Sequence, residues 1–180
     1  ETQGPGSYPF AVRVSDGTAN TDAAITVTVT EANVAPVLSG VPTSATIPEL
    51  AAYTFTAAAT DADLPAQTLT FSLVGAPTGA TINGSTGAFS WTPTEAQGPG
   101  SYPFTVRVSD GTANADAAIT LTVTEVNAAP AIANVPASAT IPELSAYTFT
   151  ATATDADVPA QTLTFSLVSA PAGASINSST

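Results

Sequence analysis

Apolar and polar residues alternate with period two along most of this chain, as they do in β-strands that bury one face. Tyr102, Phe104, Val106 and Val108 fall on one side of one such run, and Arg107 falls on the other. Gly, Pro, Asn and Asp residues separate the runs, and no stretch has helical periodicity. The pattern predicts strands at residues 37–48, 52–60, 67–74, 80–82, 88–92, 101–109 and 116–124.

Strands with one apolar and one polar face favour antiparallel sheets that pack face to face. Seven short strands within about 94 residues are typical of an immunoglobulin-like sandwich with Greek-key connections. We therefore predict an all-β fold of tandem seven-stranded β-sandwiches. Trp91 has the inward phase and is expected in the core. Tyr102 begins its strand and is a candidate tyrosine corner, with its hydroxyl bonded to nearby backbone.

An internal repeat sets the domain organisation. Residues 1–86 align with residues 95–180 at a constant offset of 94, without a gap, and 68 of the 86 positions are identical. We predict a complete repeat at 33–126, preceded by the C-terminal part of a repeat at 1–32 and followed by the N-terminal part of another at 127–180. This organisation resembles a window on a longer array.

Composition narrows the classes of partner. The chain has 14 acidic residues, two arginines, no lysine and no histidine, for a net charge of −12. A charge of this sign disfavours nucleic acid and anionic membrane as partners. Without cysteine, neither a disulfide framework nor a cysteine metal site is available. No apolar run is long enough to cross a membrane.

The acids fall in loops at the two ends of the predicted sandwich. Asp61 and Asp63 follow the second strand, and Asp110 and Asp116 lie between the last two. These loops share the end at which the domain begins. The opposite end receives three glutamates, which are Glu49, Glu95 and Glu125.

Stacking repeats end to end would bring acids of neighbouring repeats together. The junction around Asn127 would gather Glu49, Glu95, Glu125, Asp155 and Asp157, and that around Asn33 would gather Glu1, Glu31, Asp61, Asp63 and Asp110. Carboxylates that meet without a cation repel each other. Calcium, which takes six to eight oxygen ligands, would relieve this repulsion. The alternative is that these acids only solvate surface loops.

Several short motifs occur in the order found in bacterial cadherin-like repeats. They are Pro48-Glu49, Asp61-Ala62-Asp63, Ser85–Gly87, Arg107–Gly111 and the linker EVNAAP at 125–130. The chain resembles the putative-Ig or dystroglycan-type subgroup of those proteins. The resemblance implies interdomain calcium bound by Glu49, Asp61, Asp63, Asp110, Glu125 and Asn127.

The chain also departs from the cadherin pattern. Ala128 stands where a second linker acid is expected, and Trp91–Pro93 replaces the acidic motif of the fifth strand. These departures imply one or two weakly bound ions per junction, with dissociation constants of roughly 10⁻⁴–10⁻³ M.

These features predict a structural role. We expect a stalk or spacer of a large bacterial adhesin or matrix protein, at the cell surface or outside the cell, whose partners are neighbouring repeats of the same chain. In the complete repeat, Asp61 and Asp63 are the one close carboxylate pair that could serve glycoside hydrolysis, but no histidine or cleft-forming insertion accompanies them, so no enzymatic activity is expected. Two alternatives stay open: a self-associating extracellular filament, and a module that binds carbohydrate or protein.

Overall fold

A computed structural model describes residues 4–179 of the chain. The strands of the first and complete repeats are β1 (Gly6–Ser15), β2 (Asn20–Val29), β3 (Val37–Ser39), β4 (Ser44–Pro48), β5 (Tyr53–Thr56), β6 (Ala58–Thr60), β7 (Thr70–Val74), β8 (Thr81–Ile82), β9 (Ala88–Trp91), β10 (Gly100–Ser109) and β11 (Asn114–Thr124). The last segment contributes β12 (Ala131–Ala133) and β13 (Thr152–Thr154). One short 3-10 helix, η1, covers Glu95–Gln97. Among the described residues, no helix is long and apolar enough to span a membrane.

Backbone contacts group the chain into two compact units. The first comprises Glu1–Ala45, Ala52–Thr92 and Ser101–Thr122, and the second comprises Thr46–Ala51, Pro93–Gly100 and Val123–Thr180. This division does not follow the 94-residue period, so the repeat boundaries at 33 and 127 stay predictions. Each acidic cluster described below lies wholly within one unit.

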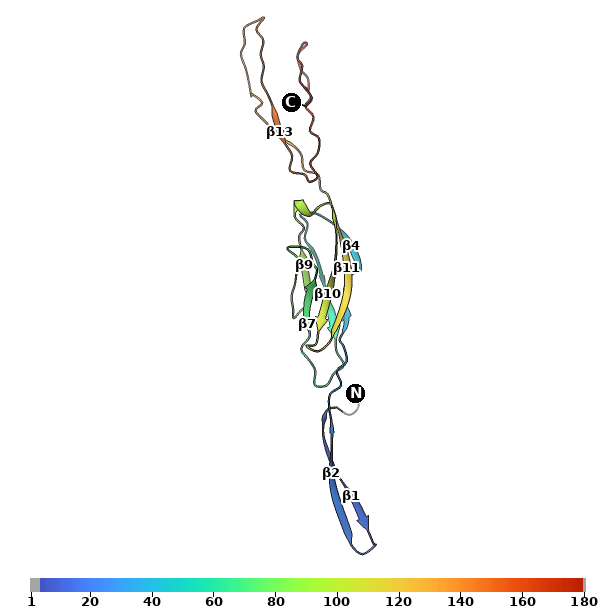
Figure 1. The fold of residues 1–180 in the computed structure, drawn as a ribbon. Helices are drawn as coiled ribbons and strands as arrows, with labels where there is room; N and C mark the ends of the chain where they lie inside the picture. The colour runs from blue at the N-terminus through green and yellow to red at the C-terminus, as the bar shows by residue number, and fades with distance from the viewer. Residues whose placement is uncertain (1–3, 180) are drawn as a thin grey trace. The chain divides into compact units, whose positions relative to one another are not determined.

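Seven strand regions make up the complete repeat, as predicted. One sheet has the order β4-β11-β10-β7 (Figure 1), and a second has the order β5-β9-β8. β3 pairs with β6 in a short ladder of its own. The strand order is not the sequence order, which is the mark of the predicted Greek-key sandwich. The all-β fold class is therefore confirmed.

The first predicted strand, 37–48, is in fact two strands. β3 pairs with β6, whereas β4 lies beside β11 in the other sheet. The amide of Thr120 donates to the Thr43 carbonyl, and the amide of Glu49 donates to the Thr124 carbonyl. Residue numbers rise together along this pair, so β4 and β11 are parallel. The expectation of purely antiparallel sheets is wrong here, because the chain changes sheets around Gly40, whose φ is +74°.

Aromatic and aliphatic side chains fill the interior of the first unit. Phe89 is 1% exposed, and its ring stacks on Phe55 at 4.6 Å and on Phe104 at 5.5 Å between centroids. Trp91 is also 1% exposed, packs edge-on against Tyr102 and donates its indole N–H to the Thr78 carbonyl. The prediction of Trp91 as a core residue is confirmed.

The tyrosine corner is seen at the equivalent tyrosine of the first, partial repeat. Tyr8 donates its hydroxyl to the Gly4 carbonyl at 2.7 Å, four residues upstream. This is the backbone contact expected of a tyrosine that begins such a strand.

The flanking segments expose the faces that the complete repeat buries. β1 pairs with β2 along ten residues, and this ladder leaves Phe10, Val12 and Val14 more than half exposed. Their copies Phe104, Val106 and Val108 are at most 5% exposed. The same sequence is therefore surface in one setting and core in the other, depending on the strands that cover it.

Asp116 does not join the acids of the loop as expected. It is the third residue of β11, and both of its carboxylate oxygens accept hydrogen bonds from Arg107 at 2.8 Å. Arg13 and Asp22 form the same pair in β1 and β2. Both pairs are substantially exposed, and such surface pairs contribute little to stability.

Candidate functional site: two acidic clusters at the linkers

Three aspartates meet beside the first linker, which is the segment EANVAP at 31–36. Asp61, Asp63 and Asp110 each offer a carboxylate oxygen, and these atoms all lie within 4.8 Å of one another. Asp63 and Asp110 are 3% and 8% exposed. Two loops bring them together, the one after β6 and the one between β10 and β11. The linker joins the cluster through Asn33, which donates its side-chain N–H to Asp110 Oδ2 at 3.0 Å.

Local turns fix two of these aspartates. Oδ1 of Asp110 accepts from the backbone amides of Thr112 and Ala113, and these bonds and the Asn33 bond lower the pKa of Asp110. Oδ1 of Asp61 accepts from the amide of Asp63 at 2.9 Å. Such turns leave the second carboxylate oxygen free to point elsewhere.

Three glutamates meet beside the second linker. Glu49, Glu95 and Glu125 also offer oxygens that lie within 4.8 Å of one another. They come from the residue after β4, the first residue of η1 and the residue after β11. Glu49 is 2% exposed, and its Oε1 accepts from the linker amide of Val126 at 2.9 Å. No lysine, arginine or histidine occurs in the second unit, which this cluster belongs to.

Several carboxylate oxygens in these clusters are buried and accept no hydrogen bond from the protein. They are Oε2 of Glu49, both oxygens of Glu125, Oδ2 of Asp61 and Oδ2 of Asp155. Burying an anionic oxygen without a partner is costly, and native structures rarely do so without water or an ion. An ion with ligand distances of 2.3–2.6 Å can bridge oxygens about 5 Å apart. The donor set is entirely oxygen, which suits a hard cation such as calcium.

The second junction also includes acids from the segment that follows the linker. Asp157 is 3% exposed and acts electrostatically on Glu125. The amide of Asp157 donates to Asp155 Oδ1, repeating the geometry of the first junction. The amide of Val158 donates to Glu95 Oε1 at 3.1 Å.

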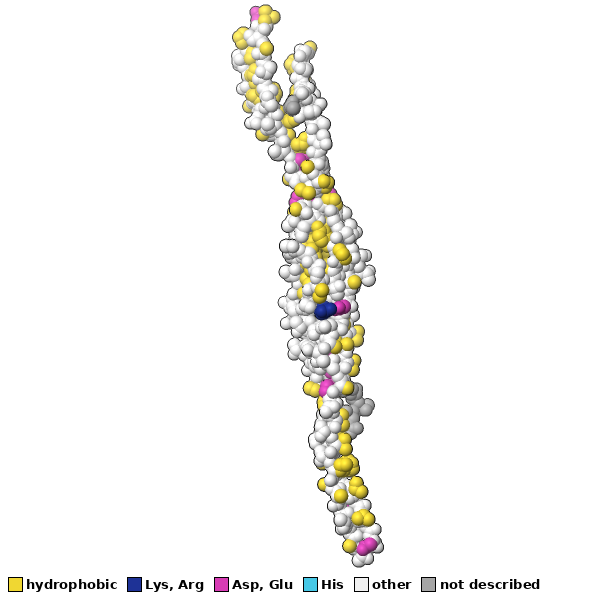
Figure 2. Space-filling model, viewed as in Figure 1, with side chains coloured by type: hydrophobic (Ala, Val, Ile, Leu, Met, Phe, Trp, Pro, Cys, Tyr) yellow, Lys and Arg dark blue, Asp and Glu magenta, His cyan; other side chains and the backbone are white. Residues whose placement is uncertain are grey.

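Two of the remaining predicted ligands lie on the linkers. Asn127 is exposed, donates to the neighbouring Ala128 carbonyl and accepts from Gln161, and Glu31, the first residue of the first linker, is half-buried. Glu1 lies outside the described residues. A metal role for all twelve candidates stays a prediction. On the face drawn in Figure 2, acidic side chains form small separate groups on a mostly uncharged surface.

Sequence reasoning missed two kinds of residue at these sites. Gln67 and Gln161 donate hydrogen bonds into the clusters. Gly98 lies against the Glu49 carboxylate, and a Cβ there would collide with Glu49 Oε2. The sequence shows that the two copies have a glutamine at the same position, as Gln67 and Gln161, but no motif links that glutamine to the acids.

Replacing Gly98 by alanine should displace the Glu49 side chain. Gly98 has φ −105° and is buried, so alanine has no backbone strain there and the collision with Glu49 dominates. We expect a loss of about 1–3 kcal/mol in unfolding free energy, as for other overpacked sites. Thermal denaturation measures it.

Gly4→Ala is the matched control for this substitution. Gly4 occupies the same position in an identical QGPGSYP sequence, and a Cβ there has open space around it. Equal effects of the two substitutions would contradict the contact with Glu49.

The pKa of Glu125 is raised above its ordinary value of 4.5, first by burial and then by the charges of Glu49, Glu95 and Asp157. A raised carboxyl pKa means that folding disfavours the charged form. In calcium-free protein, this contribution is therefore most favourable below pH 4.5 and is lost as pH rises through the raised pKa.

The melting temperature in EDTA should consequently fall over the pH range just above 4.5, and Glu125→Gln should flatten that slope. Asp110 titrates in a different window, because its pKa is lowered and its contribution is lost only at more acidic pH. If the melting temperatures of wild type and Glu125→Gln changed with pH by the same amount over this range, the assignment to Glu125 would be contradicted.

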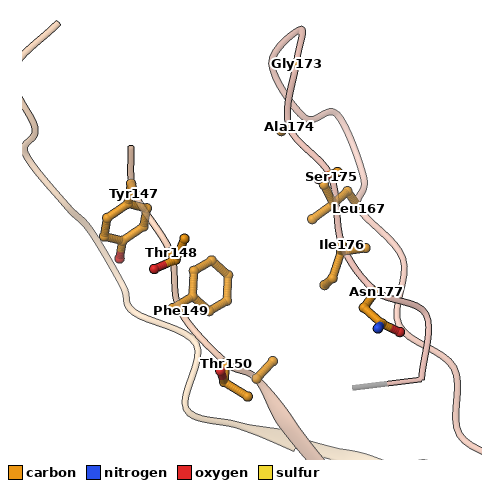
Figure 3. Close-up of a pocket in the computed structure, with 11 residues that line it drawn as sticks. Tyr147, Thr148, Phe149, Thr150, Leu167, Gly173, Ala174, Ser175, Ile176 and Asn177 are labelled. Carbon is orange, nitrogen blue, oxygen red and sulfur yellow. The ribbon is translucent and has the colours of Figure 1, made fainter. Parts of the chain in front are cut away.

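A hollow in the last segment is lined by apolar and aromatic residues. Tyr147 and Phe149 on one stretch face Leu167 and Ile176 across it (Figure 3). The copies of the two aromatic residues are Tyr53 and Phe55 on β5, which pairs with β9. The hollow is thus lined by copies of residues that belong to β5, β7 and β8 in the complete repeat, and its aromatic side chains give no specific support for carbohydrate binding.

Comparison with known proteins agrees with the fold. The family model described as "Putative Ig domain" matches residues 35–124. A search of curated proteins gave no match. Human Protocadherin-24 EC1-2 is 23% identical with a TM-score of 0.43, over 69% of this chain and 62% of that one.

Two further solved structures are similar at a lower level. Sidekick-1 immunoglobulin domains 1–5 are 18% identical with a TM-score of 0.37, over 66% of this chain and 25% of that one. The glycoside hydrolase family 107 endo-fucoidan hydrolase MfFcnA4 is 21% identical with a TM-score of 0.38, over 67% of this chain and 19% of that one. The chain spans less than two thirds of the length of each of these three proteins.

The family match covers half of the chain, and it coincides with the strands β3 to β11 that form the sandwich. It confirms the immunoglobulin-like resemblance that the sequence motifs indicated. The chain belongs to the family of the "Putative Ig domain".

Proposed function

We propose that this chain is a spacer segment of a long bacterial protein, secreted or held at the cell surface, in which calcium limits bending at the junctions between repeats. The single observation that carries the proposal is Glu49. Its carboxylate is 2% exposed, has an oxygen without a hydrogen bond, and lies among two further glutamates. Immunoglobulin-like domains are typically extracellular and non-enzymatic, which is consistent with this role.

Calcium at the junction would join parts that meet there from both sides of the linker. Glu49 and Glu95 precede the linker, Glu125 is its first residue, and Asp155 and Asp157 follow it. An ion shared by both sets would resist their separation and rotation. The β-sandwich itself has a buried apolar core and needs no ion to fold. Calcium therefore acts on the hinge and leaves the fold nearly unchanged.

A spacer also accounts for the repetition. The two copies differ at only 18 of 86 aligned positions, and the motifs of the junction recur in both. Length and stiffness are properties that accumulate with the number of repeats. Adhesion or matrix formation by the whole protein would then depend on this segment as a support.

Small-angle X-ray scattering of the purified chain, in calcium and after addition of EDTA, tests the proposed hinge. We expect the maximum dimension to decrease and the distance distribution to broaden when calcium is removed. Glu49→Gln in calcium should resemble the wild type in EDTA. Superimposable curves in calcium and EDTA would reject a calcium-stiffened junction.

A further inference from the structure

A glutamine side chain ties the first linker to the repeat that follows it. Nε2 of Gln67 donates to Asn33 Oδ1 at 2.9 Å and to Asp63 Oδ2 at 3.2 Å. The backbone amide of Val34 donates to both oxygens of the Asp63 carboxylate, at 3.0 and 3.1 Å. Asn33 then donates to Asp110 Oδ2 with the other end of its amide.

The second linker has the same arrangement. Nε2 of Gln161 donates to Asn127 Oδ1 at 2.8 Å and to Asp157 Oδ2 at 2.9 Å. The amide of Ala128 donates to Asp157 Oδ1 at 2.9 Å. The two linkers differ in sequence, EANVAP and EVNAAP, but the glutamine and the second aspartate make the same contacts in both, whereas the bond from Asn33 to Asp110 is seen at the first linker.

The second aspartate of each Asp-Ala-Asp motif accepts hydrogen bonds with both of its carboxylate oxygens. Asp63 and Asp157 are each 3% exposed, and both oxygens of each accept protein hydrogen bonds. In contrast, Asp61 and Asp155 each keep a buried oxygen without a partner. Within each Asp-Ala-Asp motif, therefore, the second aspartate holds the linker and the first has an oxygen available for an ion.

We infer that Gln67 and Gln161 are positioning residues that fasten each linker to the following repeat without any ion. The glutamine orients the asparagine and the second aspartate, and that aspartate binds the next backbone amide of the linker. In the second junction, Glu49 from the preceding repeat holds the amide of Val126. Asn127 lies between these two anchored amides, and the freedom that the contacts leave there is rotation of the Asn127 backbone.

This inference deepens the proposed function only in locating the flexible point, and its test needs no calcium. Amide hydrogen exchange by NMR, in EDTA, is measured for wild type, Gln67→Met and Gln161→Met. Methionine has similar length and lacks the N–H donor. We expect Gln67→Met to lower the protection of the Val34 amide by about tenfold or more, as loss of hydrogen bonds to a charged group implies.

Each variant serves as the control for the other. Gln67→Met should leave the Ala128 amide protected, and Gln161→Met should lower protection at Ala128 and leave Val34 unchanged. Unaltered protection of the nearby amide in either variant would overturn the inference. So would a Val34 amide that is unprotected in wild-type EDTA samples and becomes protected only in calcium.

A charged substitution separates positioning from direct binding of calcium. Gln67→Glu has no N–H donor, so we expect it to lose the Val34 protection in EDTA as the methionine variant does. If Gln67→Glu kept the Val34 amide protected in EDTA and bound calcium more tightly than wild type, residue 67 would act as a calcium ligand and the positioning role would be rejected. If the Val34 amide of the wild-type protein is protected in EDTA and the protein does not bind calcium, this inference is sustained and the proposed function is rejected.

Discussion

Glu49→Gln is expected to change stability with opposite signs in the presence and absence of calcium. In EDTA the variant should be as stable as wild type or more stable, because it removes one of three clustered negative charges. The amide oxygen of glutamine can still accept the hydrogen bond of Val126. In calcium the variant should lose the stabilisation that ion binding gives to the folded state.

The size of that loss follows from linkage. With a dissociation constant of roughly 10⁻⁴–10⁻³ M, 10 mM calcium is about 10 to 100 times the dissociation constant and stabilises the folded state by about 1.4–2.7 kcal/mol. Thermal denaturation with and without calcium measures both effects. A variant that is less stable than wild type by the same amount in both buffers would show that Glu49 acts only through its protein contacts.

Glu143→Gln is the matched control for this substitution. Glu143 is the copy of Glu49 in an identical IPEL sequence, but it is exposed and belongs to neither cluster of acids. We expect it to have no effect on stability in either buffer. A calcium-dependent effect of the same size at Glu143 would place the ion elsewhere.

Phe89→Ala is expected to cause the largest loss of stability in the complete repeat. Phe89 is 1% exposed on the central strand β9, and its ring contacts those of Phe55 and Phe104. Truncating a buried phenylalanine costs about 3–5 kcal/mol, through lost burial and the cavity left behind. Such a loss lowers the melting temperature of a domain of this size by more than about 10 °C.

Phe104 and its copy Phe10 provide an internal test of the same packing. Phe104 is 5% exposed in the core, whereas Phe10 is 52% exposed on β1. Phe104→Ala should therefore destabilise the complete repeat severely. Phe10→Ala should change the unfolding free energy of that repeat by less than about 0.5 kcal/mol. Equal losses would contradict the assignment of the core to the complete repeat alone.

The fold could be predicted because its signals are local. Period-two alternation placed all seven strand regions and gave Phe89 and Trp91 their inward phase. The division of the first predicted strand between two sheets was not predicted. A glycine at position 40 permits a bend in the chain, but it does not indicate which strand β4 pairs with. The place of Asp116 was missed for a related reason: the strand begins two residues earlier, at Asn114, and its pairing with Arg107 depends on register.

The acidic clusters were predictable from topology, but their internal roles were not. Assigning loops to opposite ends of a sandwich was enough to bring Asp61 near Asp110 and Glu49 near Glu125. The sequence could not distinguish Asp61, with its unpaired oxygen, from Asp63, which binds the linker amide. The glutamines were missed because their role depends on side-chain direction, which no spacing rule supplies.

Calcium titration of the purified chain by isothermal titration calorimetry tests the central claim most directly. We predict saturable binding, with a dissociation constant of roughly 10⁻⁴–10⁻³ M, that Glu49→Gln weakens and Glu143→Gln does not. An absence of saturable binding up to 10 mM calcium, or binding that Glu49→Gln leaves unchanged, would contradict the account.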